Sequence, residues 1–292
     1  MSVLIVADRD GDPQVALPRG LGLAKAMGWN AEVAAFCYEP IADLEAAVQA
    51  EAKRRVTAQC RKSLHARIKE HELQGVDVKT TVAWAKSLAE WVNSRVRRSN
   101  VDVVVKTGHR SETFLYTPTD WQLLRECPAP VLIAADHVWH PMRSVVAAVD
   151  LGSVSSAKKH LNDAVIRTAK DYANALKYPL HVIHVIHMSR VLKDLEIIDT
   201  RAHVAKVRRR LQPEIADLAR RHTIPVKSIR TRAGEVHRVV PSMAARLQAQ
   251  LVVMGTVGRR GVTARLMGNT AERVLARLGA DVLALKPGAP SA

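Results

Sequence analysis

Three glycines and two small polar residues near the end of the chain have the types and spacing of an anion-binding loop. An apolar segment ends at Gly255, Gly258 follows three residues later, and Gly268 comes ten residues after that. Asn269 and Thr270 then begin a helical pattern. Glycine lets backbone N–H groups approach an anion, and a helix N-terminus adds unpaired N–H donors and partial positive charge. The pattern therefore predicts a strand, a phosphate-binding loop and a helix start.

The loop has a purely architectural alternative. Its spacing matches neither the Walker A pattern nor the dinucleotide fingerprint GxGxxG. Under the alternative, the glycines serve only a tight turn, and Asn269 or Thr270 caps the helix that follows.

The chain reads as two copies of one pattern. Short apolar runs alternate with helical stretches in the same order in each half, which predicts βα units and parallel sheets. The expected strands lie at 3–8, 31–36, 76–82, 102–106 and 131–134, and again at 145–150, 180–186, 226–231, 251–254 and 282–285. The expected helices lie near 18–28, 42–73, 85–99 and 118–126, and near 157–177, 201–222, 237–249 and 269–279.

This order predicts an α/β protein of two tandem five-stranded parallel-sheet domains. We place the domains at residues 1–137 and 143–292, because the pattern breaks around 135–143, where Pro141 suits a short linker. Asp8 and Asp150 each end a first strand. Ligands of such sheets bind beyond the carboxyl ends of the strands at the switch point, so Asp150 could bind ribose hydroxyls or Mg²⁺ beside the glycine loop. The alternative for Asp150 is a turn or helix cap.

The charge is concentrated in the second half. The chain has a net charge of +16; residues 1–140 hold 18 Lys and Arg against 17 Asp and Glu, and residues 141–292 hold 26 against 11. This favours a small anionic ligand, whereas no motif of specific nucleic-acid recognition is present. No apolar run reaches the roughly 20 residues of a membrane span. The three cysteines have no ligand-like spacing, so we expect a reducing, cytoplasmic location.

The glycine loop resembles the nucleotide-binding motif of the universal stress protein family. That motif has a glycine, two residues, a second glycine, nine residues, and a third glycine followed by Ser or Thr; here Asn269 takes the Ser position and Thr270 follows. The stretch from Thr117 to Leu132, beginning Thr-Pro-Thr-Asp-Trp, resembles the E-type tandem members. The resemblance covers the whole chain and implies ATP or a related adenine nucleotide as ligand, in those members that keep the motif.

Carried over to this chain, the resemblance implies three groups of binding residues. Near the adenine and ribose it places Val149, Asp150, Val185, Met254 and Gly255. Around the phosphates it places Gly258, Arg259, Gly268, Asn269 and Thr270. Gly234 matches a loop that borders the pocket.

The first half departs from this motif. On our alignment Lys106 replaces the first glycine and His109 the second, while Pro118 removes an N–H donor where the phosphate would lie. We therefore expect this half to be degenerate, although Lys106, His109 and Arg110 could still hold an anion.

The sequence thus predicts a non-catalytic stress-response protein that binds a nucleotide or related anion in its second domain. A weak ATPase, a binder of an amphiphilic nucleotide or lipid beneath the long helices at 42–73 or 201–222, and a scaffold without a small ligand are the alternatives. We expect the last strands of the two halves to pair across a pseudo-twofold, which would make one chain an intramolecular pseudo-dimer. Further assembly into a homodimer is left open.

Overall fold

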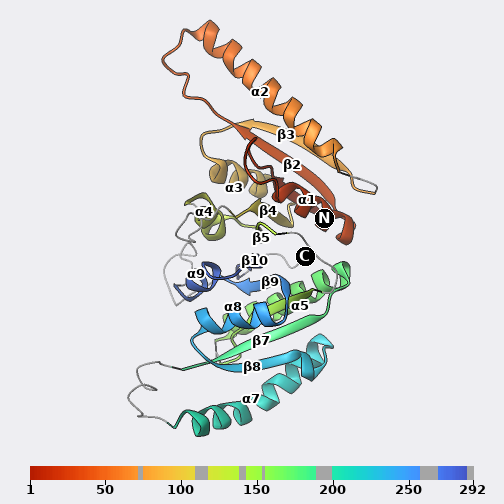
Figure 1. Ribbon diagram of the computed structural model, residues 1–292, viewed down its shortest axis with the longest axis vertical. Helices are drawn as coiled ribbons and strands as arrows, with labels where there is room; N and C mark the ends of the chain where they lie inside the picture. The colour runs from red at the N-terminus through yellow and green to blue at the C-terminus, as the bar shows by residue number, and fades with distance from the viewer. Residues whose placement is uncertain are drawn as a thin grey trace. The chain divides into compact units, whose positions relative to one another are not determined.

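The computed structural model describes residues 1–71, 75–108, 118–137, 143–152, 155–188, 199–256 and 269–287. These residues form two compact units, which we call unit 1 (described residues up to 137) and unit 2 (described residues from 143 onward). Figure 1 labels their helices and strands.

Unit 1 alternates strands and helices from its first residues. Its elements are β1 (Ser2–Val6), α1 (Ala16–Met27), β2 (Asn30–Cys37), α2 (Ala46–Lys69), β3 (Val78–Trp84), α3 (Leu88–Arg98), β4 (Val103–Thr107), α4 (Pro118–Glu126) and β5 (Val131–Ala134). The strand order is β3-β2-β1-β4-β5, and each neighbouring pair within it is parallel.

Unit 2 repeats this arrangement. Its elements are β6 (Ser144–Val149), α5 (Ser156–Leu176), β7 (Leu180–His187), α7 (Thr200–His222), a 3₁₀ turn (Val226–Ser228), β8 (Ile229–Gly234), α8 (Val236–Arg246), β9 (Ala249–Gly255), α9 (Asn269–Leu275) and β10 (Asp281–Leu285). The strand order is β8-β7-β6-β9-β10, again parallel throughout. The predicted α/β class and the two tandem five-stranded parallel sheets are confirmed.

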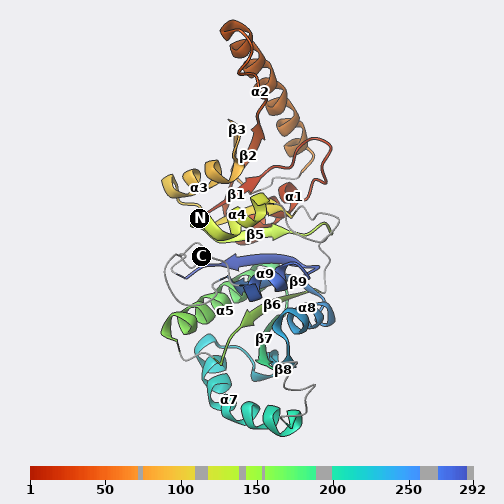
Figure 2. The same cartoon turned by 90° about the vertical axis from the view of Figure 1, so that its left-hand side faces the viewer.

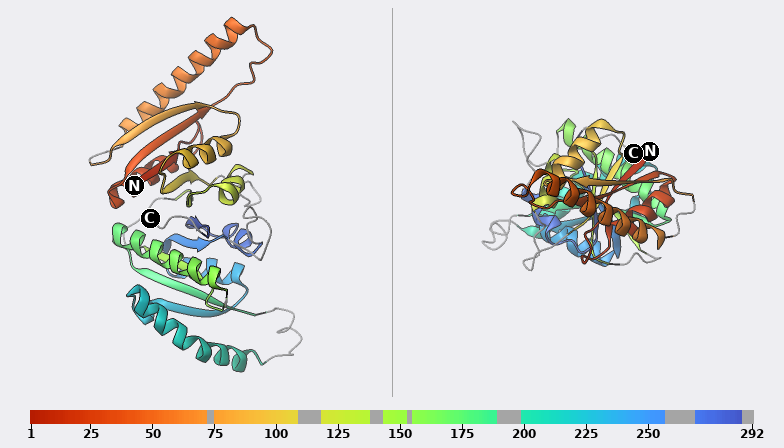
Figure 3. Two further views of the ribbon diagram at one scale, coloured as in Figure 1. Left: turned by 180° about the vertical axis from the view of Figure 1, so that it is seen from behind. Right: turned by 90° about the horizontal axis from the view of Figure 1, so that it is seen from above.

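The strand order places a switch point in the middle of each sheet. The chain runs outward through β1, β2 and β3, then returns to the other side of β1 to form β4 and β5, and unit 2 does the same from β6. Right-handed crossovers require the helices of the two directions to cover opposite faces of a sheet. Accordingly α8 packs on α9 on one face of unit 2, while α5 covers the other face, as Figures 1 and 3 show.

The central strands are apolar because both of their faces are covered. Val3, Leu4 and Ile5 of β1 are fully buried, as are Val145, Val146 and Ala147 of β6 and the middle of β9. Such continuous Val, Leu, Ile and Ala runs are typical of parallel strands between two helix layers. Within the described residues, no helix is both long and apolar enough to cross a membrane.

The pairing of the strands corrects our alignment of the two halves. Because β4 pairs with β1 in the register in which β9 pairs with β6, Thr107 occupies the strand position of Gly255. The next residue in each unit donates its N–H to the last residue of the neighbouring strand, at 2.8 and 2.9 Å. Lys106 therefore corresponds to Met254 and does not replace the glycine. By the same one-residue shift, His109 does not correspond to the second glycine. His109 lies outside the described residues.

Two element bounds also differ from those expected. Residues 226–228 form a 3₁₀ turn rather than the start of a strand, so β8 begins three residues later than predicted. In unit 1, β3 is displaced by two residues from the expected 76–82. Both segments are at the edge of a sheet, where one-sided burial leaves a weak apolar signal.

Candidate functional site

Asp150 lies directly after β6, beside the switch point of unit 2. Its Oδ1 accepts the Gly152 N–H at 3.2 Å, and its Oδ2 pairs with Lys158 Nζ at 3.2 Å. Asn162 of α5 holds the backbone of Asp150 on both sides, accepting its N–H at 3.1 Å and donating to its carbonyl at 2.8 Å. The predicted turn role is therefore present. The side chain nevertheless stays 55% exposed, so the carboxylate is open to solvent.

A buried histidine supports the loop that carries Asp150. The Nδ1 atom of His184, on β7, accepts the Leu151 N–H at 3.2 Å and lies 3.3 Å from the Val149 carbonyl. Burial lowers the pKa of His184, while Val149 and Asp150 oppose that shift. A neutral ring fits the geometry, because an unprotonated Nδ1 can accept the Leu151 N–H. Nothing in the sequence pattern singled out His184.

The end of β9 lies next to this loop and packs closely against α5. A Cβ built on Gly255 would lie 2.5 Å from Leu161 Cδ2 and 2.9 Å from Leu161 Cγ. Gly255 thus has a packing reason to be glycine, independent of any ligand. Met254 is 6% exposed beside it, and Val149 is half-buried at the end of the neighbouring strand β6.

Two further predicted site residues, Val185 and Gly234, lie in strands β7 and β8 of unit 2. Val185 is buried within β7, and it pairs with β8. Gly234 ends β8 with φ of +145°, a conformation that favours glycine, and an added Cβ would meet Val239 at 2.8 Å. Both residues border the carboxyl ends of the strands, where the site was predicted.

The helix that follows the glycine loop is held by a second histidine. Arg273 of α9 donates from Nη2 to Nε2 of the buried His237 on α8, at 2.9 Å. Asn269 begins α9 and Thr270 is exposed in its first turn. The remaining predicted residues, Gly258, Arg259 and Gly268, lie outside the described residues.

In unit 1 the corresponding position is occupied by the chain's own groups. Asp8 is 6% exposed, and its Oδ2 accepts the N–H groups of Val15 and Ala16 at 3.0 and 3.1 Å. The Thr107 hydroxyl, at the position of Gly255, donates to the same oxygen at 2.8 Å and accepts the Ala16 N–H at 2.8 Å. The first strand's aspartate is therefore hydrogen-bonded to the backbone at the start of α1.

Unit 1 also contains a buried ion pair next to Thr107. Lys106 Nζ lies 2.6 Å from Asp120 Oδ1, with side chains 6% and 0% exposed, and it also donates to the Thr107 carbonyl at 2.9 Å. Asp120 belongs to the first turn of α4, the helix that corresponds to α9. The Lys106 ammonium group, which could have held an anion, is thus engaged by an internal carboxylate.

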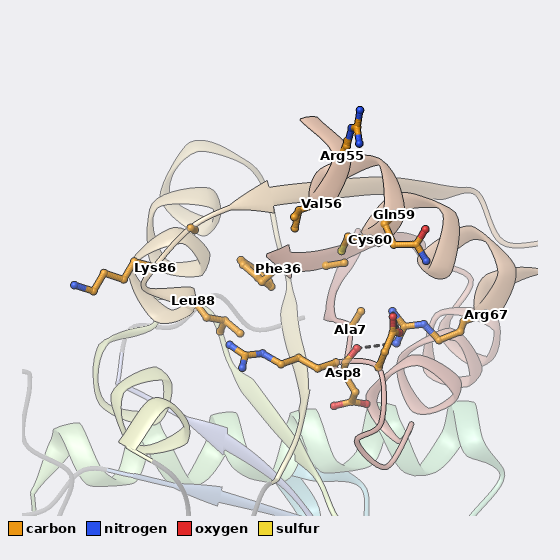
Figure 4. A pocket seen from close by; sticks show the side chains of 14 residues that line it. Ala7, Asp8, Phe36, Arg55, Val56, Gln59, Cys60, Arg67, Lys86 and Leu88 are labelled. Atoms are coloured by element: carbon orange, nitrogen blue, oxygen red, sulfur yellow. Dashed lines mark hydrogen bonds and ion pairs between the residues drawn. The ribbon is translucent and has the colours of Figure 1, made fainter. Parts of the chain in front are cut away.

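Unit 1 instead has a cavity of about 490 Å³ at the carboxyl ends of β1, β2 and β3, beneath α2. Figure 4 shows Phe36 of β2, Val56 and Cys60 of α2, and Leu88 of α3 pointing toward it. The cavity is also lined by charged side chains, which are Asp8, Arg9, Asp10, Arg55, Arg67 and Lys86. Arg67 joins α2 to the end of β1, donating to the Asp8 carbonyl at 2.7 Å. Across the part of the chain that the structure describes, no three His, Cys, Asp or Glu side chains form a candidate metal site.

These features define a tandem α/β protein with two units of the same strand order. The sequence matches the universal stress protein family over residues 1–135 and again over 142–286, and the chain belongs to that family. This membership supports a role in the stress response.

Relatives of the E type match nearly the whole chain. It is 29% identical over 296 residues to Universal stress protein E of Escherichia coli K12, covering 98% of this chain and 94% of that one. It is 27% identical over 300 residues to the Universal stress protein E homolog of Haemophilus influenzae, covering 98% and 97%. The resemblance to tandem E-type proteins predicted from the sequence is confirmed.

Solved structures show the same fold over the full length. A functionally unknown protein from Pseudomonas aeruginosa PAO1 matches with a TM-score of 0.74 at 26% identity, covering 98% of this chain and 92% of that one. A universal stress protein from Pseudomonas aeruginosa UCBPP-PA14 matches with a TM-score of 0.70 at 28% identity, covering 98% and 93%.

Proposed function

We propose that unit 2 binds a nucleotide-type anion at the carboxyl ends of β6 and β9 and holds it without chemical conversion. The contrast between the two units carries this proposal. Asp150 is exposed beside a strand that ends in Gly255, whereas Asp8 is buried beneath Thr107. In unit 1 the carboxylate after the first strand is thus hydrogen-bonded within the protein, whereas in unit 2 the equivalent carboxylate is exposed to solvent.

Charge supports the same assignment. Residues 141–292 have a net charge of +15, and residues 1–140 have +1. In unit 2 the Asp150 carboxylate can accept ribose hydroxyls or contribute to Mg²⁺ binding, while backbone N–H groups at the start of α9 face the phosphates. In unit 1 the Asp120 carboxylate already supplies a negative charge at the start of α4. The first unit then serves as a structural partner.

The experiment is mass spectrometry of small molecules released from freshly purified, denatured protein, combined with thermal shifts on adding ATP. We expect a co-purified nucleotide or a stabilising shift, and we expect loss of both in Gly258→Trp. Gly279→Trp is the matched control, because no atom lies within 4 Å of a Cβ added there. Absence of a released nucleotide together with absence of a shift refutes the proposal.

A second candidate function is favoured by the cavity in unit 1. Its lining is apolar around Phe36, Val56 and Leu88, and its rim carries Arg9 and Lys86. An amphiphile with an acyl chain and an anionic headgroup would satisfy both parts, since apolar surface and positive charge are recognised together. The long helix α2 would form the outer wall of this site.

Displacement of a fluorescent fatty-acid probe by lauric acid tests this second candidate. Val56→Trp should fill the cavity and abolish probe binding. Val48→Trp is the matched control, because Val48 lies on the same helix, is 49% exposed and is not part of the lining. Equal probe binding by the two variants would exclude the cavity as the binding site.

A further inference from the structure

Two cysteines from different elements lie near one another beside the unit 1 cavity, which Cys60 lines. Cys37 is the last residue of β2, and Cys60 lies within α2 and lines the cavity. The Cys37 sulfur is 3.8 Å from the hydroxyl of Thr57, one helical turn before Cys60. The Cys37 thiol lies near Cys60, since it adds to the rise in the pKa of the Cys60 thiol that burial causes. Both cysteines are free and half-buried, whereas Cys127 is fully buried.

The helix that carries Cys60 is held to the sheet at one end. Within α2, the buried residues are Leu64 and Ile68, both in its last two turns. Residues 46–60 have exposed or half-buried side chains, and Figures 1 and 2 show this part of the helix extending away from the rest of unit 1. Segments with few buried contacts open at low free-energy cost, so this part of α2 is the movable wall of the cavity.

We propose that Cys37 and Cys60 form a reversible disulfide that fastens α2 to β2 and fixes the wall of the cavity. The oxidant is a peroxide. One thiol reacts with hydrogen peroxide to give a sulfenic acid and one water. The second thiol then attacks that sulfur, forming the S–S bond and releasing a second water. Two electrons pass from the two thiols to one peroxide, and a small dithiol reductant reverses the step by exchange.

The solvent access and the raised pKa of Cys60 predict that peroxide oxidises this thiol slowly. Cys60 faces a cavity that is open to solvent, so a small peroxide can reach the sulfur. Burial raises the pKa of the Cys60 thiol, with Cys37 adding to the effect. Because the thiolate is the reactive form, we expect oxidation to be slow at neutral pH and faster as the pH rises.

Peptide mapping of the full-length chain tests the pairing. The protein is treated with hydrogen peroxide, free thiols are alkylated, and the chain is digested without reduction. We expect one cross-linked peptide pair containing Cys37 and Cys60, reversed by dithiothreitol, in wild type and in Cys127→Ser. The cross-link should be absent in Cys60→Ser. Cys37 and Cys60 that stay fully alkylatable under conditions that oxidise free glutathione, or that link only between chains, overturn the proposal.

Hydrogen exchange separates a fastened helix from an incidental disulfide. Oxidised wild type should exchange the amides of residues 46–60 at least several-fold more slowly than reduced wild type. Cys37→Ser treated with the same peroxide should show no change. Equal exchange of residues 46–60 in the oxidised and reduced forms would contradict the claim that the disulfide fixes the cavity wall.

Discussion

Replacing Thr107 by Val tests whether unit 1 is closed by its own hydrogen bonds. The substitution keeps the shape of the side chain and removes the hydroxyl that donates to Asp8 and accepts from Ala16, both at 2.8 Å. Asp8 keeps two backbone N–H partners at 3.0 and 3.1 Å, so the carboxylate loses one of three donors rather than all of them.

The magnitude follows from this partial loss. A buried group that loses one hydrogen-bond partner destabilises a fold by about 1–3 kcal/mol. With a urea dependence of about 2 kcal/mol per molar for a unit of this size, the unfolding midpoint should fall by about 0.5–1.5 M. Thr107 is not among the residues of the ligand site that we propose in unit 2.

Tryptophan fluorescence during urea unfolding reports mainly on unit 1. Four of the five tryptophans of the chain belong to that unit, at positions 29, 84, 91 and 121. Thr168→Val in α5 is the matched control, because the Thr168 hydroxyl is buried without a hydrogen-bond partner among the described residues. Its removal should leave the far-ultraviolet circular dichroism transition unchanged or shift it upward. If Thr107→Val shifts the midpoint no more than Thr168→Val, the hydrogen bonds to Asp8 do not close unit 1.

Three further outcomes are expected. Burial holds the pKa of His184 below its ordinary 6.5, so the unfolded chain binds a proton in acid that the folded protein does not. The free energy of unfolding should therefore fall by up to about 1.4 kcal/mol per pH unit below pH 6.5. Urea midpoints measured across that range should vary less in His184→Asn. Lys106→Met should destabilise unit 1 by about 3–5 kcal/mol, because the Asp120 carboxylate stays buried without its cation, and Asp120→Asn added to it should restore part of the loss in the fluorescence transition. Gly255→Ala should cost about 1–3 kcal/mol through its overlap with Leu161, and a double-mutant cycle with Leu161→Ala should show coupling between the two sites; strict additivity would rule out the clash as the cause.

Much of the fold could be predicted because apolar runs and glycines have direct physical causes. Strands buried on both faces read as Val- and Ile-rich segments, and the repeat made each half a check on the other. The end of β4 was misjudged by one residue because Lys106 is a charged residue inside a buried strand. Its burial depends on the ion pair with Asp120, which lies in helix α4, and the periodic pattern of apolar residues does not reveal that pair.

The site was predicted less completely for a related reason. The glycine at 255 was visible in the sequence, but its contact with Leu161 requires knowing how α5 lies on the sheet. Three histidines in β7 gave no functional signal, because hydrophobic periodicity does not show that His184 accepts a backbone N–H behind Asp150. Asp8 and Asp150 looked equivalent in sequence. In the structure Asp8 is buried and accepts hydrogen bonds from Val15, Ala16 and Thr107, whereas Asp150 is exposed and pairs with Lys158.

Calorimetric titration of ATP into the full-length chain tests the central claim most directly. The contrast between the closed unit 1 and the open unit 2 predicts one nucleotide bound per chain, with binding lost in Gly258→Trp and retained in Gly279→Trp. Two nucleotides per chain would contradict the closure of unit 1. Binding that survives Gly258→Trp unchanged would contradict the assignment of the site to unit 2.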